Sequence, residues 1–415
     1  MNHPGESLPV VQDEPPLRVG AIVFALWLVL FTSSSQFLIV APVLPRIGEA
    51  LAVPEAHLGT LVTGYAAAVA FFAILAGPIS DRFGRRLVLR VGSISMAIAL
   101  LLHGIADTFE LLLSLRVLAG MASGILSGAA VAYIGDVLPY NQRGKALGWV
   151  MSGFAFGQIA GIPLGTILAG ELGFQAPFVV FGVVMLVAFG GTMHVLAPTK
   201  GSNTDALSLR SGLKTYQSLL RQPELLAITI ASAVMMFGVS SYIVYEPTWL
   251  EAFFKATPNQ VASLFLVGGI ASAISGPIAG RLSDRIGRKP MVVVSSAALS
   301  VLMAITTYLP SFNMIYGLFF IIMVAVGARV SPLNAWMTAL VEMKRRGSLI
   351  SMTMAAGQAG FALGAGMAGW TYVEAGYRSN TMLGAGAALG TALILWAFVP
   401  EPAPQQEGVI LEAKA

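Results

Sequence analysis

Long apolar stretches separated by short polar connections dominate the pattern of this chain. A helix needs about 20 consecutive apolar residues to cross the hydrocarbon core of a bilayer. Twelve stretches meet that length, and the sequence shows no alternation of the kind that barrel strands have. We therefore predict an all-α membrane protein with spans at 20–45, 58–80, 87–106, 110–135, 146–170, 176–197, 224–249, 260–282, 291–309, 312–340, 348–372 and 379–399.

One long polar connection separates six of these spans from the other six. It is rich in Ser, Thr, Lys and Arg, which indicates the cytoplasmic side. The prediction is therefore a cytoplasmic N-terminal tail at 1–19, a six-helix bundle at 20–197, a cytoplasmic loop at 198–223, a second six-helix bundle at 224–399 and a cytoplasmic C-terminal tail at 400–415.

Basic residues are distributed unevenly between the two faces of this topology. With the N-terminus in the cytoplasm, 19 of the 24 Lys and Arg residues lie on the cytoplasmic side, three lie in outer loops and two lie within spans. This asymmetry follows the positive-inside rule and explains the net charge of +4 without a nucleic-acid partner. We expect a multi-pass protein of a bacterial inner membrane with both termini in the cytoplasm.

Composition narrows the function classes. Hydrophobic residues make up 56% of the chain and charged residues 11%, against about a quarter charged in soluble domains, so lipid is the expected solvent. The chain has no cysteine, and its four histidines lack the spacing of metal ligands. It also lacks a P-loop and a nucleophile–base pattern. We expect a monomer that carries a small molecule, with no metal, no cofactor and no enzymatic activity.

The two predicted bundles are related by an internal repeat. A single offset of 203 residues connects the pairs Asp81–Asp284, Gly84–Gly287, Arg85–Arg288, Arg143–Arg346, Gly157–Gly360 and Gly161–Gly364. One shift that relates separate places along the chain indicates an internal duplication, which is a common plan for transporters.

Two short basic loops carry the clearest motif, from Gly77 to Arg86 and from Gly280 to Lys289. Each must turn between two membrane helices within a few residues, and Gly84 and Gly287 can adopt the positive φ that such a turn requires. Asp81 at a helix end can form charge-assisted hydrogen bonds with the neighbouring arginines. The alternative is that the loops act only as a positive-inside topology signal.

These loops resemble the signature of the major facilitator superfamily between its second and third helices, and the resemblance covers all twelve spans. It implies two bundles that rock about a midplane cavity, lined by helices 1, 4, 7 and 10. It also implies a gate that holds the cytoplasmic side closed in the outward-facing state. The expected gate residues are Asp81, Arg82, Gly84, Arg85, Arg86, Asp136, Arg143, Asp284, Arg285, Gly287 and Arg288. Asp136 could instead be an interfacial acid that stabilises only its own loop.

Arg116 is a charge within the fourth span, where an ionisable residue usually faces a cavity or a partner. The stretch from Arg116 to Ser123 and Gly124 resembles the helix-4 signature of proton-driven drug exporters, in which the arginine is linked to proton transfer. The alternative is an arginine whose charged end extends to the outer interface.

The fifth span carries small residues and a proline at Gly157, Gly161, Pro163 and Gly165. Glycines four apart share a helix face and allow close approach of two backbones, and a proline can kink the helix. The run resembles the helix-5 signature of antiporters, although Ile162 separates Gly161 from Pro163 and Thr166 stands where the signature has a final glycine. The alternative is simple packing through glycine.

Proton coupling needs a protonatable group inside the membrane. The first span offers only three serines and Gln36, where many relatives in the exporter branch carry an acid. Glu246 is therefore the best candidate, and Tyr242, four residues earlier, should share its helix face. The alternative is an interfacial Tyr–Glu anchor.

Arg329 in the tenth span is 13 residues from Glu342 and cannot easily reach the interface. We expect it to line the cavity, with an acidic substrate group or Glu246 as its partner. The predicted cavity and coupling residues are thus Gln36, Arg116, Tyr242, Glu246, Arg329 and Asn334.

The sequence thus predicts a secondary transporter that works by alternating access, and more specifically a proton-coupled exporter of small amphipathic compounds, drug-like or metabolite. A uniporter or an importer of sugars, organic acids or lipids remains the alternative. A non-transporting receptor or scaffold is a further alternative, but the tails and the central loop are too short for an added domain.

Overall fold

A computed structural model describes residues 19–197, 209–342 and 345–401 of the protein. The regular elements of these residues are all helices, which confirms the predicted all-α fold. Most of the two predicted tails and residues 198–208 of the predicted central loop lie outside the described residues. The rest of that loop contains a short helix, α8.

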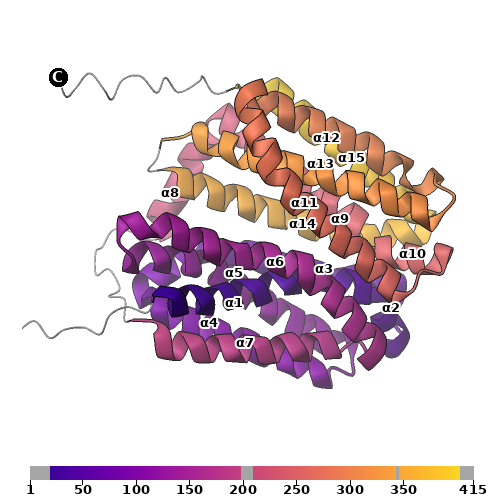
Figure 1. Ribbon diagram of the computed structural model, residues 1–415, viewed down its shortest axis with the longest axis horizontal. Helices are drawn as coiled ribbons and strands as arrows, with labels where there is room; N and C mark the ends of the chain where they lie inside the picture. The colour runs from indigo at the N-terminus through magenta and orange to yellow at the C-terminus, as the bar shows by residue number, and fades with distance from the viewer. Residues whose placement is uncertain (1–18, 198–208, 343–344, 402–415) are drawn as a thin grey trace, which may run out of the picture.

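The helices form two halves that lie side by side (Figure 1). The N-terminal half contains α1 (Val19–Leu38), α2 (Val40–Leu51), α3 (Glu55–Phe83), α4 (Arg85–Leu102), η1 (His103–Ile105), α5 (Phe109–Val137), α6 (Tyr140–Leu172) and α7 (Ala176–Val195). The C-terminal half contains α8 (Leu209–Leu220), α9 (Pro223–Ile243), α10 (Glu246–Phe254), α11 (Pro258–Ile286), α12 (Arg288–Ile305), η2 (Thr306–Tyr308), α13 (Phe312–Ala339), α14 (Arg346–Ala375) and α15 (Tyr377–Phe398).

Eleven spans in the described chain are long and apolar enough to cross a membrane. The remaining predicted span, at 348–372, corresponds to α14 (Arg346–Ala375), which has 30 residues but is not among those eleven. Helix α14 is rich in Gly and Ala and packs against α3 and α9. Because other helices cover it, it needs less apolar surface of its own than a helix surrounded by lipid.

The internal repeat is visible in the backbone. The residues with positive φ in the described chain form three pairs, each 203 residues apart: Ala52 (50°) with Lys255 (55°), Gly84 (85°) with Gly287 (99°) and Gly173 (91°) with Gly376 (69°). The helix caps Thr108 and Ser311 have the same spacing, and each accepts a hydrogen bond from the amide three residues later. The two halves therefore share helix ends and turns as well as sequence motifs.

The helix that forms the first span of each half is interrupted, although Pro223–Phe254 still counts as one span that is long and apolar enough to cross a membrane. Helix α1 ends at Leu38 and α2 begins at Val40, while α9 ends at Ile243 and α10 begins at Glu246. A proline follows each break, Pro42 and Pro247. A proline has no amide hydrogen for the carbonyl four residues earlier, and its ring clashes with that carbonyl.

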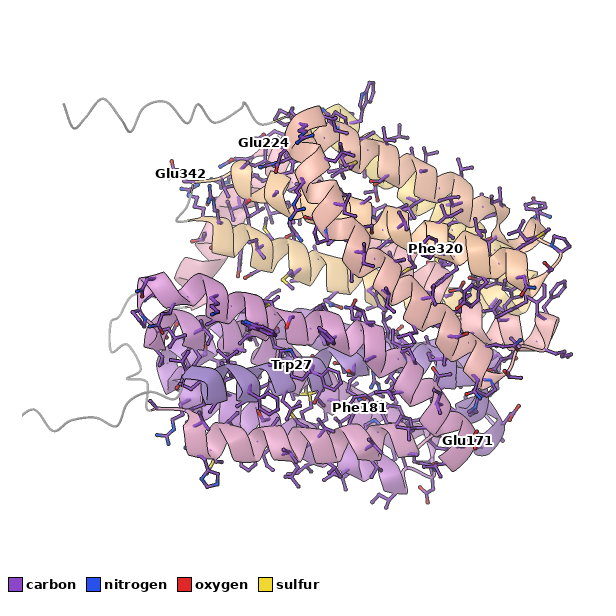
Figure 2. The ribbon with its side chains drawn as sticks, in the orientation of Figure 1. Trp27, Glu171, Phe181, Glu224, Phe320 and Glu342 are labelled. Atoms are coloured by element: carbon purple, nitrogen blue, oxygen red, sulfur yellow. The ribbon has the colours of Figure 1, made fainter. Side chains whose placement is uncertain are left out.

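The two ends of the molecule differ in character. We name the end that carries α2 and α10 the clasp end, and the opposite end, where α3 meets α4 and α11 meets α12, the loop end. In Figure 1 the clasp end is on the right and α8 marks the loop end on the left. Figure 2 shows Glu171 at the clasp end and Glu224 and Glu342 toward the loop end, whereas Trp27 and Phe181 lie between them. The three labelled acids thus lie toward the two ends of the molecule, and Trp27 and Phe181 lie in its middle.

The halves meet along two helix pairs, α3 with α14 and α6 with α11. The internal repeat relates the two pairs to each other, because α3 corresponds to α11 and α6 corresponds to α14. Small residues allow the close approach. A Cβ atom on Gly59 would collide with the carbonyl oxygen of Ala365, and one on Gly269 would lie 3.1 Å from the Cα of Ile159.

The glycines of the fifth span pack α6 onto the first helix of its own half. A Cβ atom on Gly157 would collide with Ser34, and one on Gly161 would collide with Ser35. The repeat-related Gly364 faces the carbonyl oxygen of Phe237 on α9 in the same way. Pro163 and Gly165 lie within α6, which runs as one helix from Tyr140 to Leu172. The glycine spacing thus serves close packing of α6 against α1.

Candidate functional site

Arg116 on α5 is fully buried at the clasp-end side of the N-terminal half. Its Nη2 atom donates a 2.8 Å hydrogen bond to the main-chain carbonyl oxygen of Gln36, and its Cζ atom lies 4.2 Å from the centre of the Tyr65 ring. The Nε and Nη1 atoms have no hydrogen-bond partner among the described residues. The guanidinium group is therefore held inside the bundle by a carbonyl group and an aromatic face, and it does not extend to the interface.

A buried histidine and phenylalanine complete this group of side chains. His103 Nδ1 lies 2.6 Å from the carbonyl oxygen of Ala99, and its ring stacks on Phe178 at 4.5 Å. A carbonyl oxygen only accepts, so Nδ1 is the donor and Nε2 is left without a partner in the described chain. The Phe178 ring centre is 5.8 Å from Arg116 Cζ. We name Gln36, Tyr65, His103, Arg116 and Phe178 the arginine corner.

The serines of the first span hold α1 against its neighbours. Ser33 Oγ lies 2.7 Å from Ser123 Oγ on α5, and Ser34 Oγ donates to the carbonyl oxygen of Phe154 on α6 at 2.9 Å. The Gln36 side chain has no hydrogen-bond partner among the residues that the structure describes. Helix α1 thus contributes hydroxyl and amide groups to the bundle interior.

Glu246 is the first residue of α10 and is fully buried. Neither carboxyl oxygen has a hydrogen-bond partner of normal geometry within the described chain. The phenol groups of Tyr242 and Tyr377 lie close enough to interact with it electrostatically. An ionised carboxyl group without a cationic partner is costly to bury, so this site suits a carboxyl group that carries a proton.

Two tyrosines and a threonine surround this carboxyl group. Tyr377 Oη donates to the carbonyl oxygen of Tyr242 at 2.9 Å, and Tyr242 Oη lies 3.1 Å from Thr306 Oγ1. We name Tyr242, Glu246, Thr306 and Tyr377 the glutamate corner. The sequence expectation of one helix face for Tyr242 and Glu246 was wrong, because α9 ends between them. They are neighbours because the chain turns there, which is a consequence of Pro247.

Arg329 on α13 is also buried, with 2% of its surface exposed. Its Nε atom has no partner in the described chain, and no ion pair joins it to Glu246 there. The expected contact is missing because α13 begins at the clasp end with Phe312, so Arg329 lies about 25 Å along the helix from that end. Asn334 is exposed. The six predicted cavity residues therefore form two separate corners, with Arg329 and Asn334 apart from both.

The expected gate residues at the loop end form two separate clusters. In the N-terminal half, Arg85 contacts Asp81, and its Nε atom lies 3.2 Å from an oxygen of Asp136. In the C-terminal half, Arg288 Nη2 lies 3.4 Å from Asp284. These ion pairs stay within their own half.

Main-chain groups complete both clusters. Arg143 Nε donates to the carbonyl oxygen of Leu138 at 2.8 Å, and Arg288 Nη1 donates to that of Ala335 at 3.0 Å. The Glu401 carboxyl group accepts from the amides of Arg288 and Lys289, both at 2.8 Å. The start of α12 has amides without helical partners, and Glu401 satisfies two of them. Sequence reasoning missed Glu401, because this acid is 112 residues away in sequence from Lys289, whose amide it accepts from.

Polar contacts between the two halves gather at the clasp end. Tyr245 on the C-terminal half accepts a 2.9 Å hydrogen bond from the Gly59 amide and donates a 2.6 Å bond to the carbonyl oxygen of Glu55. The Arg46 guanidinium lies 3.2 Å from the Glu251 carboxylate. We name these five residues the clasp.

Further contacts between the halves flank the clasp. Thr63 Oγ1 donates to the carbonyl oxygen of Ala362 at 2.9 Å, and the rings of Phe37 and Phe361 lie 4.5 Å apart. Phe37 in turn lies 6.2 Å from Tyr65 of the arginine corner. The contacts that are described between the halves thus lie toward one end of the molecule.

Two surface grooves of the described chain contain none of these charges. One groove of about 460 Å³ lies between α11 and α13, and one of about 340 Å³ lies between α3, α4 and α5, both lined mainly by apolar side chains. Within the described residues, no three His, Cys, Asp or Glu side chains gather as metal ligands would. Among the described residues, the two corners, Arg329, the clasp and the loop-end clusters bring together charged and polar side chains.

Comparisons with known proteins agree with this architecture. The chain is 26% identical over 353 residues to the uncharacterized MFS-type transporter YceJ of Bacillus subtilis, covering 84% of this chain and 89% of that protein. It is 28% identical over 320 residues to the multidrug resistance protein MdtG of Proteus mirabilis, covering 75% and 78%. The crystal structure of a D-xylose–proton symporter has the same fold, with a TM-score of 0.74, 16% identity and coverage of 93% and 99%.

A sequence model of the Major Facilitator Superfamily matches residues 26–253 and again residues 228–414. Together these matches extend over nearly the whole chain. The fold that they imply, two pseudo-symmetric six-helix bundles, is the one described above. The chain belongs to the Major Facilitator Superfamily of membrane transporters.

Proposed function

We propose that the protein is a proton-coupled exporter of small amphipathic compounds that works by alternating access between its two halves. The observation that carries this proposal is Glu246, a fully buried carboxyl group within a membrane span of a transporter. Ionisable residues inside a membrane are costly and usually serve transport or proton transfer. Export is supported by the similarity to MdtG, which is named as a multidrug resistance protein.

The arginine corner fits the same function. Arg116 is a fixed cation in the N-terminal half, and Glu246 is a proton carrier in the C-terminal half. A transporter that exchanges a proton for a substrate must favour one conformation with the proton bound and another without it. Glu246 supplies the group that changes charge, and Arg116 supplies a charge that stays constant.

The conformation follows from the contacts between the halves. With the loop end in the cytoplasm, as the distribution of basic residues predicts, the clasp closes the outer side. The loop-end clusters around Arg85 and Arg288 make their ion pairs within their own half. We assign this arrangement to the inward-facing state, and we propose that the same loops meet and close the cytoplasmic side in the outward-facing state.

The test is transport by purified protein in lipid vesicles. A thermal-shift screen of amphipathic compounds at two pH values identifies a ligand, because a compound that binds the folded state raises its melting temperature. Uptake of that compound is then measured with and without an imposed pH gradient. A gradient that neither drives nor inhibits the flux would contradict proton coupling.

Glu246→Gln separates proton-coupled transport from the uncoupled transport of a uniporter, and the direction in which the pH gradient drives the compound separates export from proton-coupled import. In a coupled exporter this variant loses the effect of the pH gradient but still exchanges substrate, because a glutamine mimics the protonated carboxyl group. The control is Glu171→Gln, which changes an exposed acid at the same end. A facilitator would keep its full flux in both variants. The similarity in fold to a D-xylose–proton symporter leaves a uniporter or an importer in place as the alternative.

A further inference from the structure

The break between α9 and α10 directs two adjacent side chains to different environments. Tyr245 reaches across to the N-terminal half, where its hydroxyl group bonds to the Gly59 amide and the Glu55 carbonyl oxygen of α3. Glu246, the next residue, is buried inside the C-terminal half. Any movement that withdraws Tyr245 from α3 must also move Glu246, because a single peptide bond joins them.

Glu246 is enclosed by neutral groups. The phenol groups of Tyr242 from α9 and Tyr377 from α15 are close enough to interact with it electrostatically, and Thr306 Oγ1 from η2 lies 3.1 Å from Tyr242 Oη. From α14, Tyr372 stacks on Tyr245 at 5.1 Å. The charged residue nearest to Glu246 along the chain is Glu251, and it forms an ion pair with Arg46 on α2. The closed clasp therefore surrounds Glu246 with groups that fit its neutral form and offer no counter-charge to its ionised form.

We propose that Tyr245 is a positioning residue that ties the closed clasp to the protonated form of Glu246. The clasp closes when Glu246 carries a proton, and it opens when the carboxyl group ionises and requires water. The coupling is reciprocal. Closing the clasp raises the affinity of Glu246 for a proton by the same factor by which protonation of Glu246 favours the closed clasp. The inference rests on the proposed function only in treating Glu246 as the group that carries the proton.

The chain is well suited to a test because it has no cysteine. Ala362 is 5% exposed and lies one helix turn before Gly366, where a Cβ atom would lie 3.0 Å from Thr63 Oγ1 of the other half. Residues four apart share a helix face, so an Ala362→Cys thiol should become accessible when the halves separate at this end. The measurement is the rate of labelling by a water-soluble maleimide in lipid nanodiscs, which expose both faces to one pH. Asp107→Cys, at an exposed position, gives the reactivity of a free thiol at each pH, and rates are expressed relative to it.

We expect the relative labelling rate of Ala362→Cys to rise at least about tenfold between about pH 5.5 and pH 8.5, since one proton is released per opening. Adding Glu246→Gln should keep the rate low at every pH. Adding Tyr245→Phe removes both bonds to α3 and should give a high rate with little dependence on pH. Tyr372→Phe is its matched control, because that tyrosine stacks on Tyr245 and has no described hydrogen bond to α3.

A further variant protects the test against misfolding of Tyr245→Phe. Replacing both Arg46 and Glu251 by glutamine loosens the clasp without touching Tyr245, so the rate should rise while its pH dependence remains. A pH response that survives in Glu246→Gln, or that is the same in Tyr245→Phe and Tyr372→Phe, overturns the proposal. Labelling requires neither substrate nor flux, so a failure of proton-driven transport with an intact labelling response would contradict the proposed function alone.

Discussion

The arginine corner and the glutamate corner occupy corresponding places in the two halves, yet one holds a fixed cation and the other a protonatable acid. His103 and Thr306 are 203 residues apart, and each lies in the short 3-10 turn that follows the third span of its half. Around His103 the buried charge is Arg116, and around Thr306 it is Glu246. The two halves thus share the same arrangement of helices and turns, whereas the buried ionisable residues beside these turns differ.

The positions of the two charges explain how the halves can differ without loss of the fold. By the 203-residue offset, Arg116 corresponds to Phe319, and Glu246 corresponds to Val43. Each of these two residues thus has an apolar residue at the corresponding position of the other half. A fixed cation and a protonatable acid perform different tasks, and a two-lobed transporter can assign one to each lobe.

Replacing Arg116 by methionine should produce the largest effect in this comparison. We expect transport to fall by about 10- to 100-fold, the equivalent of one charge-assisted hydrogen bond. The melting temperature should stay the same or rise, because the cost of burying the charge is removed. The measurements are initial rates in vesicles and thermal unfolding, with the exposed Arg378→Met as the control. Loss of folded protein without a specific loss of transport would make Arg116 a structural residue.

The loop-end clusters give a second contrast between the halves. The Asp81 side chain is 27% exposed and contacts Arg85, which also binds Asp136, whereas the Asp284 side chain is 63% exposed. We expect Asp81→Asn to lower transport about fivefold and Asp284→Asn about twofold or less, since exposed ion pairs contribute little. Initial rates at equal amounts of inserted protein provide the measurement. Equal losses in the two variants would show that burial does not determine the role of these loops.

The smallest effect should come from replacing His103 of the arginine corner by threonine, the residue that its counterpart Thr306 provides in the glutamate corner. His103→Thr removes a stacked ring and should lower the free energy of unfolding by about 1 kcal/mol. Transport should change less than about twofold, because a buried histidine with one satisfied nitrogen fits a structural role. Thermal unfolding and the pH profile of transport test this. A pH profile that shifts in His103→Thr, but not in the exposed His194→Gln, would instead identify His103 as a second proton site.

Several parts of the fold follow from sequence because they depend on local physics. Apolar length predicts the spans, the 203-residue offset predicts the repeat, and the glycines at 84 and 287 predict positive φ in the loop-end turns. The breaks after Leu38 and Ile243 could also have been predicted, since Pro42 and Pro247 lie four residues later.

The contacts of the candidate site could not be read from the sequence in the same way. Tyr245 binds main-chain groups of Glu55 and Gly59, and a main-chain partner has no signature in residue type. Arg329 and Glu246 have opposite charges, which suggested a pair, but their depths in the membrane depend on where α13 and α10 begin. The distance between two spans depends on how the helices pack, and it cannot be derived from a single sequence alone.

Helix α14 has a consequence for how the protein is made. It is a span-length helix of the described chain that is not among the eleven long, strongly apolar spans, and its packing partners are α3 and α9. Both partners precede α14 in the chain, so they are synthesised and inserted into the bilayer before it. Its entry into the membrane therefore depends on helices of both halves. The two halves should thus begin to associate while the chain is still being inserted into the membrane.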